Sequence, residues 1–264
     1  MAIIYDISKL PQEVQDQITS SDKYTKWFSE FPTKLLNFDN PKTIKGEKKQ
    51  VRTGVLYLSP AKKSGVNLCP MAHIAGCEDP CLDEAGRGAM TSTQMSRLRK
   101  TLFMLQYSEL FTAMLKKEVM VHIRYSLARD FIPAIRPNGT TDVRWELSLW
   151  DFMVETTNLG ARWYDYTKIA NRIIPDPKVY DLTFSYSGKP EYRRFVDTAK
   201  AMGMRLAVVF RYQHQIPEVF EGMRTVDGDD SDLRFLEPQG VVSALYAKGK
   251  AVHDTSGFIV GEMQ

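Results

Sequence analysis

The chain lacks long apolar runs, a leader-like N-terminus and the common signatures of nucleotide-binding and hydrolytic enzymes. No apolar run reaches the roughly 18 residues of a membrane-spanning helix, and residues 1–17 lack the basic and apolar regions of a signal peptide. There is no GxxxxGKS/T phosphate loop, GxSxG elbow or HExxH zinc helix. We therefore expect a cytoplasmic protein that does not use the membrane.

Composition is compatible with an ordinary globular protein. The 264 residues are 43% hydrophobic and 25% charged, which suits one large domain or two small ones. The formal net charge of +3 neither requires nor excludes a nucleic-acid partner. We expect peripheral helices and a basic loop over residues 1–50 and an α/β domain over 51–264. The lysine-rich part of that loop, residues 38–50, is read as solvated, with contact to a phosphate backbone as the alternative.

Cysteine is scarce, but its distribution is not random. All three cysteines, Cys69, Cys77 and Cys81, fall in one stretch that also holds His73. An odd count leaves one thiol over if two of them pair, and a reducing compartment disfavours disulfides. The clustering favours a metal or iron–sulfur loop over a disulfide or inert thiols. Four ligands spaced four residues apart on one helix would span about 18 Å, so the segment must curl back.

Two cofactors suit these ligands. Three thiolates can hold three irons of a [4Fe–4S] cluster, which leaves the fourth iron open to His73, solvent or a small molecule. The rival is zinc held by the three cysteines and His73. We favour the cluster, because zinc ligands usually come in pairs at short gaps. This assignment leaves open whether the protein is an enzyme or an electron carrier with a redox partner.

Strands and helices are expected to alternate along the rest of the chain. Strands are predicted over 51–59, 132–136, 161–166, 181–185, 205–211 and 241–247, and helices over 92–118, 145–157, 169–174 and 191–202. Such alternation indicates a parallel sheet with outer helices. Either an open doubly wound sheet or a complete or partial (β/α) barrel would satisfy it. We favour the barrel-like form, because no GxGxxG turn follows a predicted strand.

Polar residues follow the predicted strands, where the carboxyl ends of parallel strands form one face. The cysteine loop follows the first strand, and the residues predicted to bind a cofactor near it are Arg87, Asn138, Asp142, Tyr166, Lys168 and Ser185. Arg87 and Lys168 are the groups expected to orient a small anionic ligand such as a carboxylate.

Two resemblances accompany these motifs. The combination resembles a family of bacteriophage proteins labelled by a gene-product number, over roughly residues 51–260. It is carried by Cys69-Pro70, Cys77, Cys81-Leu82, residues 85–88, residues 138–142, residues 164–168, residues 182–185, residues 226–229, residues 232–235 and residues 247–249. This resemblance implies a phage origin and the host cytoplasm, and brings no established activity.

The second resemblance is architectural. A three-cysteine loop after the first strand of a (β/α) barrel is similar to the radical S-adenosylmethionine enzymes, and it implies S-adenosylmethionine as the first ligand to test. Their loop is Cys-x₃-Cys-x₂-Cys, whereas the spacing here is Cys-x₇-Cys-x₃-Cys.

Overall fold

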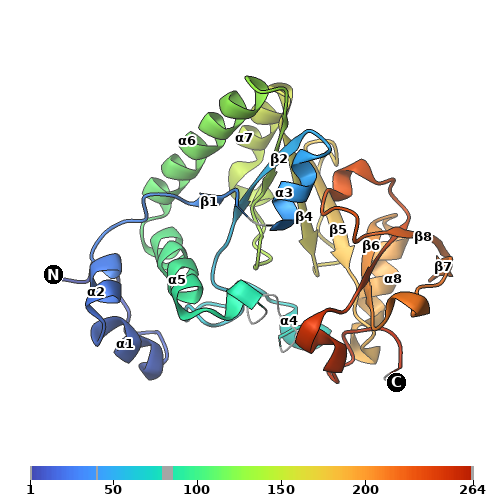
Figure 1. The fold of residues 1–264 in the computed structure, drawn as a ribbon, viewed down its shortest axis with the longest axis horizontal. Coiled ribbons are helices and arrows are strands. Elements are labelled where there is room, and N and C mark those ends of the chain that lie inside the picture. The colour runs from blue at the N-terminus through green and yellow to red at the C-terminus, as the bar shows by residue number, and fades with distance from the viewer. Residues whose placement is uncertain (1, 40, 79–85, 263–264) are drawn as a thin grey trace.

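The computed structural model describes residues 2–39, 41–78 and 86–262. Within them the chain builds a mixed α/β fold around a nine-stranded sheet (Figure 1). The strands are β1 Leu36–Asn37, β2 Val51–Leu56, β3 Ile132–Arg136, β4 Arg162–Thr167, β5 Tyr180–Ser185, β6 Arg205–Phe210, β7 Val219–Phe220, β8 Met223–Asp227 and β9 Val242–Tyr246. The α-helices are α1 Gln12–Thr19, α2 Asp22–Phe28, α3 Pro41–Glu47, α4 Ala72–Ala75, α5 Thr91–Gln106, α6 Ser108–Leu127, α7 Glu146–Asn158 and α8 Arg193–Ala201. Short 3₁₀ turns cover Gly86–Ala89, Pro190–Tyr192, Gln213–Gln215, Arg234–Leu236 and Gly249–His253.

The sheet is largely parallel and its central strands follow chain order. The order across the sheet is β1-β2-β3-β4-β5-β6-β9-β8-β7, with β1 and β7 antiparallel to their neighbours. Strand β6 alternates little between polar and apolar residues, because strands of a parallel sheet are covered on both faces. In the described pairings β1 and β7 form the two edges, so closure into a barrel is not part of the observed pairing.

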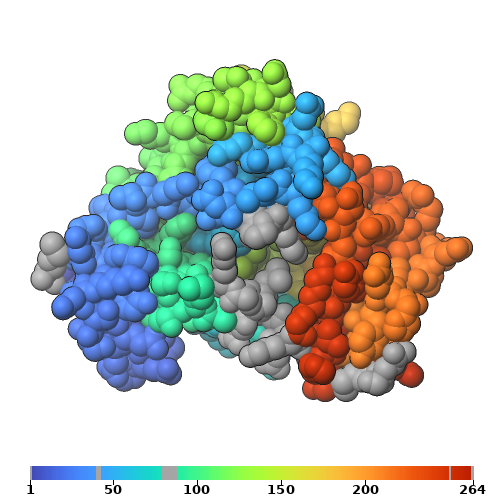
Figure 2. All heavy atoms as spheres, viewed as in Figure 1, coloured from blue at the N-terminus to red at the C-terminus, as the bar shows by residue number. Residues whose placement is uncertain are grey.

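Two hydrophobic clusters attach the helices to the sheet. The larger one joins strand residues such as Ile135 and Trp163 to α5, α6 and α7, and it also takes in Ile18 and Phe28 of the N-terminal helices. The smaller one packs α8 and α4 against β5, β6 and β9. Figure 2 shows the N-terminal residues (blue) and C-terminal residues (orange and red) on opposite flanks of one face. The proposed division at residue 50 stays a prediction.

Three predicted elements were wrong in detail. The helix expected over 92–118 is two helices, α5 and α6, and the chain leaves helical geometry at Tyr107 (φ −135°, ψ 50°). The Tyr107 hydroxyl donates to the Ile4 carbonyl at 2.6 Å, and its ring contacts Tyr5 and Phe31. This aromatic docking of the N-terminal segment explains the break, which the apolar spacing alone does not reveal.

The other two corrections concern short segments. The expected helix over 169–174 is a turn, because Arg172 within it is buried and held by hydrogen bonds to acceptors outside the segment. The expected basic loop over 38–50 contains α3, which covers Pro41–Glu47. No described helix has the length and apolar character needed to cross a membrane.

Candidate functional site

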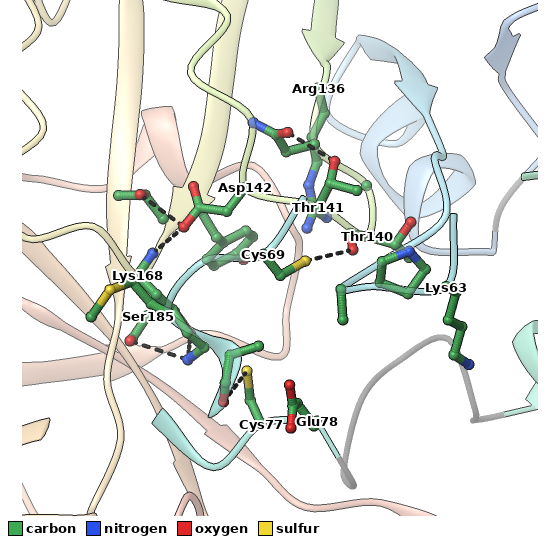
Figure 3. A pocket seen from close by; sticks show the side chains of 18 residues that line it. Lys63, Cys69, Cys77, Glu78, Arg136, Thr140, Thr141, Asp142, Lys168 and Ser185 are labelled. Carbon is green, nitrogen blue, oxygen red and sulfur yellow. Dashed lines mark hydrogen bonds between the residues drawn. The ribbon is translucent and has the colours of Figure 1, made fainter. Parts of the chain in front are cut away.

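A pocket lies at the carboxyl edge of the sheet, where β3, β4 and β5 end (Figure 3). Its volume of about 340 Å³ falls in the range of small-molecule sites. It is lined by Pro60, Ala61, Lys63, Cys69, Met71, Ala72, Cys77, Glu78, Arg136, Asn138, Gly139, Thr140, Thr141, Asp142, Tyr166, Thr167, Lys168 and Ser185. The structure therefore brings together two of the three cysteines and five of the six residues predicted to bind a cofactor.

Helix α4 places the two cysteines on the pocket wall. Cys69 precedes α4, and its Sγ lies 3.6 Å from the Thr140 carbonyl oxygen. Cys77 follows α4, and its Sγ lies 3.7 Å from the Ala72 carbonyl oxygen. Gly76 ends the helix in the left-handed region (φ 67°), which turns the chain so that Cys77 comes back toward Ala72. The chain thus turns back at Gly76 between these two residues, and the three-cysteine loop itself stays a prediction.

The remaining members of the predicted set have different outcomes. Cys81 lies outside the described residues, as does the side chain of Arg87. His73 does not line the pocket: its side chain is 90% exposed, and its Nδ1 lies 3.5 Å from the Glu78 carboxylate. Among the residues that the structure describes, no three His, Cys, Asp or Glu side chains come together as a metal site.

The loop after β3 is built by its own hydrogen bonds. The buried Asn138 side chain accepts from the Thr141 hydroxyl, the Val143 amide and the Trp145 indole, and donates to the Val143 carbonyl. These contacts occupy both ends of the side-chain amide and fix the shape of the loop, and a binding role for Asn138 stays a prediction. A Cβ on Gly139 would lie 2.5 Å from the Tyr57 ring, and only glycine fits there.

Asp142 and Lys168 tie the ends of β3 and β4 together. Asp142 accepts from the Lys168 amide at 2.7 Å, from the Thr167 hydroxyl at 3.2 Å and from Arg172 at 3.0 Å. Burial raises the pKa of the Asp142 carboxyl, and the charge of Arg172 opposes that rise. The Lys168 ammonium donates to the Ser185 hydroxyl at 2.9 Å, so two predicted site residues contact each other directly.

Burial and a nearby positive charge act in opposite directions on the pKa of the Cys77 thiol. Burial raises the pKa of the Cys77 thiol, and the Lys168 ammonium opposes that rise. A lysine beside a buried thiol lowers the free energy of the thiolate, which is the metal-binding form of cysteine.

Three charged residues that were not among the predicted site residues lie beside them. Arg136, at the end of β3, lines the pocket between Asp165 of β4 and Asp232. Its guanidinium carbon lies 4.7 Å from the centre of the Tyr166 ring, and the Tyr166 hydroxyl donates to Asp232 at 2.8 Å. For Asp165 the available signal was a carboxylate between aromatic residues of a predicted strand, because ionisable groups are rarely buried without a partner.

The chain belongs to the Gene product 88 family, which it matches over residues 34–261. This match confirms the family resemblance carried by the cysteine loop and the strand motifs. No curated protein and no solved structure matches the chain. The resemblance to radical S-adenosylmethionine enzymes stays a prediction.

Proposed function

We propose that this protein is an iron–sulfur protein that holds a [4Fe–4S] cluster on Cys69, Cys77 and Cys81 in the pocket at the carboxyl edge of the sheet. The observation that carries the proposal is that Cys69 and Cys77, on either side of α4, line one pocket. Cys81 lies outside the described residues and follows the pocket residue Glu78 by three positions in the sequence.

The position of His73 favours the cluster over zinc. A closed Cys₃His zinc site needs the histidine beside the thiols. The His73 side chain is instead exposed and next to Glu78, outside the pocket lining. A three-thiolate cluster tolerates this position, because its fourth iron stays open to a small molecule.

We further propose that the sheet forms a partial (β/α) barrel. Strands β2 to β6 lie side by side in chain order and all run parallel, as barrel strands do. In such folds the ligand sits at the carboxyl ends of the strands, and the pocket lies there.

When bound, an open iron supplies a Lewis-acid position or an electron. The residues of the chain then bind and orient the ligand. Lys168, held by Ser185, offers a positive charge on the wall that also carries Cys77. We propose a small carboxylate-bearing ligand, S-adenosylmethionine being the first to test, and redox or S-adenosylmethionine-type chemistry in the host cytoplasm.

Metal analysis of anaerobically purified protein tests the cluster. We expect iron and sulfide, a brown colour and broad visible absorption. Cys69→Ser, Cys77→Ser and Cys81→Ser should each lose most of the iron, because a hydroxyl is a poor replacement for a thiolate. His73→Ala is the matched control and should keep it.

Each other result has a definite meaning. Colourless protein with one zinc would replace the cluster with a zinc-stapled binding module that acts on host protein or nucleic acid. Full iron in any one cysteine variant would remove that cysteine from the ligand set. Protein without iron or zinc after anaerobic purification and cluster reconstitution would contradict both the cluster and the zinc site.

A further inference from the structure

Arg136 is a buried cation whose hydrogen-bonding capacity is only partly used. Its side chain is 12% exposed, and Nη1 donates to Asp232. Nε is buried and makes no hydrogen bond among the described residues, and Nη2 has no partner there either. Guanidinium groups hold carboxylates through two parallel N–H donors, so a buried arginine with unused donors in a pocket is prepared for an anion.

Asp165 is the matching unsatisfied acceptor. It is fully buried, and its Oδ2 accepts from the Tyr180 hydroxyl and the Asn138 amide, both at 2.9 Å. Its Oδ1 makes no hydrogen bond within the described part of the chain and lies 3.5 Å from Arg136 Nε. An unsatisfied buried carboxylate oxygen costs free energy unless the group is protonated or serves a function.

We propose that Arg136 anchors the carboxylate of a small ligand whose only anionic group is that carboxylate, and that Asp165 takes up a proton when the ligand binds. The inference rests on the proposed function, because it assigns the ligand class of the same pocket. It adds an anchoring residue and a coupled proton that the cysteine ligands do not imply.

The local charges favour a ligand with a single negatively charged group. Among the described residues, the cations that line the pocket are Lys63, Arg136 and Lys168, and the acidic groups other than Asp165 that line it or contact these cations are Glu78, Asp142 and Asp232. These charges balance, so a single added negative charge is accommodated when Asp165 is neutral. A phosphate dianion would bring a second charge that no described group of the pocket balances.

Asp165 can change its charge near neutral pH. Burial raises the pKa of the Asp165 carboxyl to about 7, and Arg136 limits that rise. The charged or titratable groups that face Asp165 are Arg136 from β3, Tyr180 from β5 and Arg172 from the loop after β4. Tyr164, the residue before Asp165 in β4, also interacts with it. Glu146 of α7 and Asp232 pair with the same arginines.

The sign of the coupling follows from this arrangement. A carboxylate on Arg136 adds negative charge beside Asp165 and competes for the same cation, so binding raises the pKa of Asp165. The ligand therefore binds the protonated protein better. Affinity should fall about five- to tenfold between about pH 6 and about pH 8, with up to about one proton taken up per ligand.

Titration calorimetry on the full chain tests the coupling. The carboxylate probes are acetate, methionine and S-adenosylmethionine, and the other anion is inorganic phosphate. Each titration is run at about pH 6 and about pH 8 in two buffers with different heats of ionisation, which gives the protons taken up. Iron is counted on the same samples. We expect a carboxylate to bind with proton uptake, and phosphate to bind weakly or not at all at about pH 8, where it is mainly a dianion.

Two variants separate the roles. Arg136→Lys keeps a cation near Asp232 but loses the paired donors, and should weaken carboxylate binding about tenfold or more. Arg144→Lys, at a half-exposed arginine outside the pocket lining, is the matched control and should bind as the wild type does. Asp165→Asn mimics the protonated state, so it should abolish proton uptake and bind at about pH 8 as tightly as the wild type does at about pH 6.

Each contrary result would contradict one part of this proposal. Tight phosphate binding without carboxylate binding overturns the ligand class. Wild-type affinity in Arg136→Lys overturns the anchor, and pH-independent affinity in the wild type overturns the proton at Asp165. Iron-loaded protein that binds none of the probes overturns this inference and leaves the cluster intact. Carboxylate binding without any metal leaves the inference and removes the proposed function.

Discussion

Arg205 and Arg136 are both buried beside aspartates, but they lie at opposite ends of the same parallel sheet. Arg205 begins β6, and all three of its side-chain nitrogens donate: Nε to Pro238, Nη1 to Asp181 and Thr183, and Nη2 to the Glu237 carbonyl. Arg136 ends β3, and only its Nη1 makes a hydrogen bond among the described residues. At the amino-terminal end of the sheet, Arg205 therefore uses all three of its side-chain nitrogens as donors, whereas Arg136 at the carboxyl end retains unused donors beside a pocket.

This difference separates stabilising groups from binding groups. A buried charge with every hydrogen bond made is costly to disturb, because removing one partner leaves the other uncompensated. A buried charge with spare donors contributes less to folding and more to recognition of what enters. We therefore expect substitutions at the two ends to differ in what they damage.

The largest effect should come from Arg205→Gln. It leaves Asp181 without its cation and two carbonyl groups without donors, so unfolding free energy should fall by about 3–5 kcal/mol. Chemical denaturation measures this. Arg224→Gln, at an exposed position of β8, is the control and should change it by no more than about 0.5 kcal/mol. A loss at Arg205 no larger than the control would end the distinction between the two ends.

The sequence predicted six of the nine described strands, β2 to β6 and β9, and the edge at which the pocket lies. Buried apolar runs identify strands such as β3, whose bounds were predicted without error, and parallel strands place their following loops together. For this reason Asn138, Lys168 and Ser185 could be grouped before any contact was known. Their binding roles stay predictions.

The ion pairs could not be derived in this way. Arg172 meets Glu146 and Asp142 only because a turn replaces the expected helix. The Arg136–Asp165 contact depends on the register of β3 and β4. Such contacts depend on where the side chains of different strands and loops point, and hydrophobic periodicity carries no information about this.

The second-largest expected effect on stability comes from His122 of α6. Its Nε2–H donates to the Ala134 carbonyl at 3.1 Å, which leaves Nδ1 to accept from Arg52 and Ser126. Burial lowers the pKa of His122 to about 4. The unfolded chain therefore binds a proton first, and this contribution is intact above about pH 6.5 and lost as the pH falls toward 4.

The size of that loss is roughly 3 kcal/mol, since one pKa unit corresponds to about 1.4 kcal/mol. His122→Gln retains a donor for Ala134 but does not titrate. Subtracting its denaturation free energies from those of the wild type between about pH 4 and about pH 7 isolates the histidine. A difference that does not change with pH would mean that His122 titrates normally in the fold.

Arg136→Gln should lower the free energy of unfolding less than Arg205→Gln does. This variant therefore tests the comparison between the two ends of the sheet directly. Asp165 can take up a proton once Arg136 is gone, and Asp232 keeps its hydrogen bond from Tyr166. We expect a loss of about 1–2 kcal/mol in the same denaturation assay at about pH 6. A loss as large as that at Arg205 would show that Arg136 is as structural as its counterpart.

The smallest effect should come from Ser185→Ala, which removes one hydrogen bond on the pocket wall. The Lys168 ammonium loses the 2.9 Å contact with the hydroxyl but keeps the Ser185 carbonyl at 3.4 Å and the Phe258 ring at 4.3 Å. Because the ammonium keeps these contacts and lies at a pocket that water can enter, unfolding free energy should fall by only about 0.5–1 kcal/mol. Ser243→Ala, at a fully buried hydroxyl of β9 that donates to Glu237, is the matched comparison and should cost more, about 1–3 kcal/mol. Denaturation of both variants under one condition decides the matter: equal losses would mean that the wall beside Lys168 is as tightly packed as the interior, and the pocket could then not admit a ligand there.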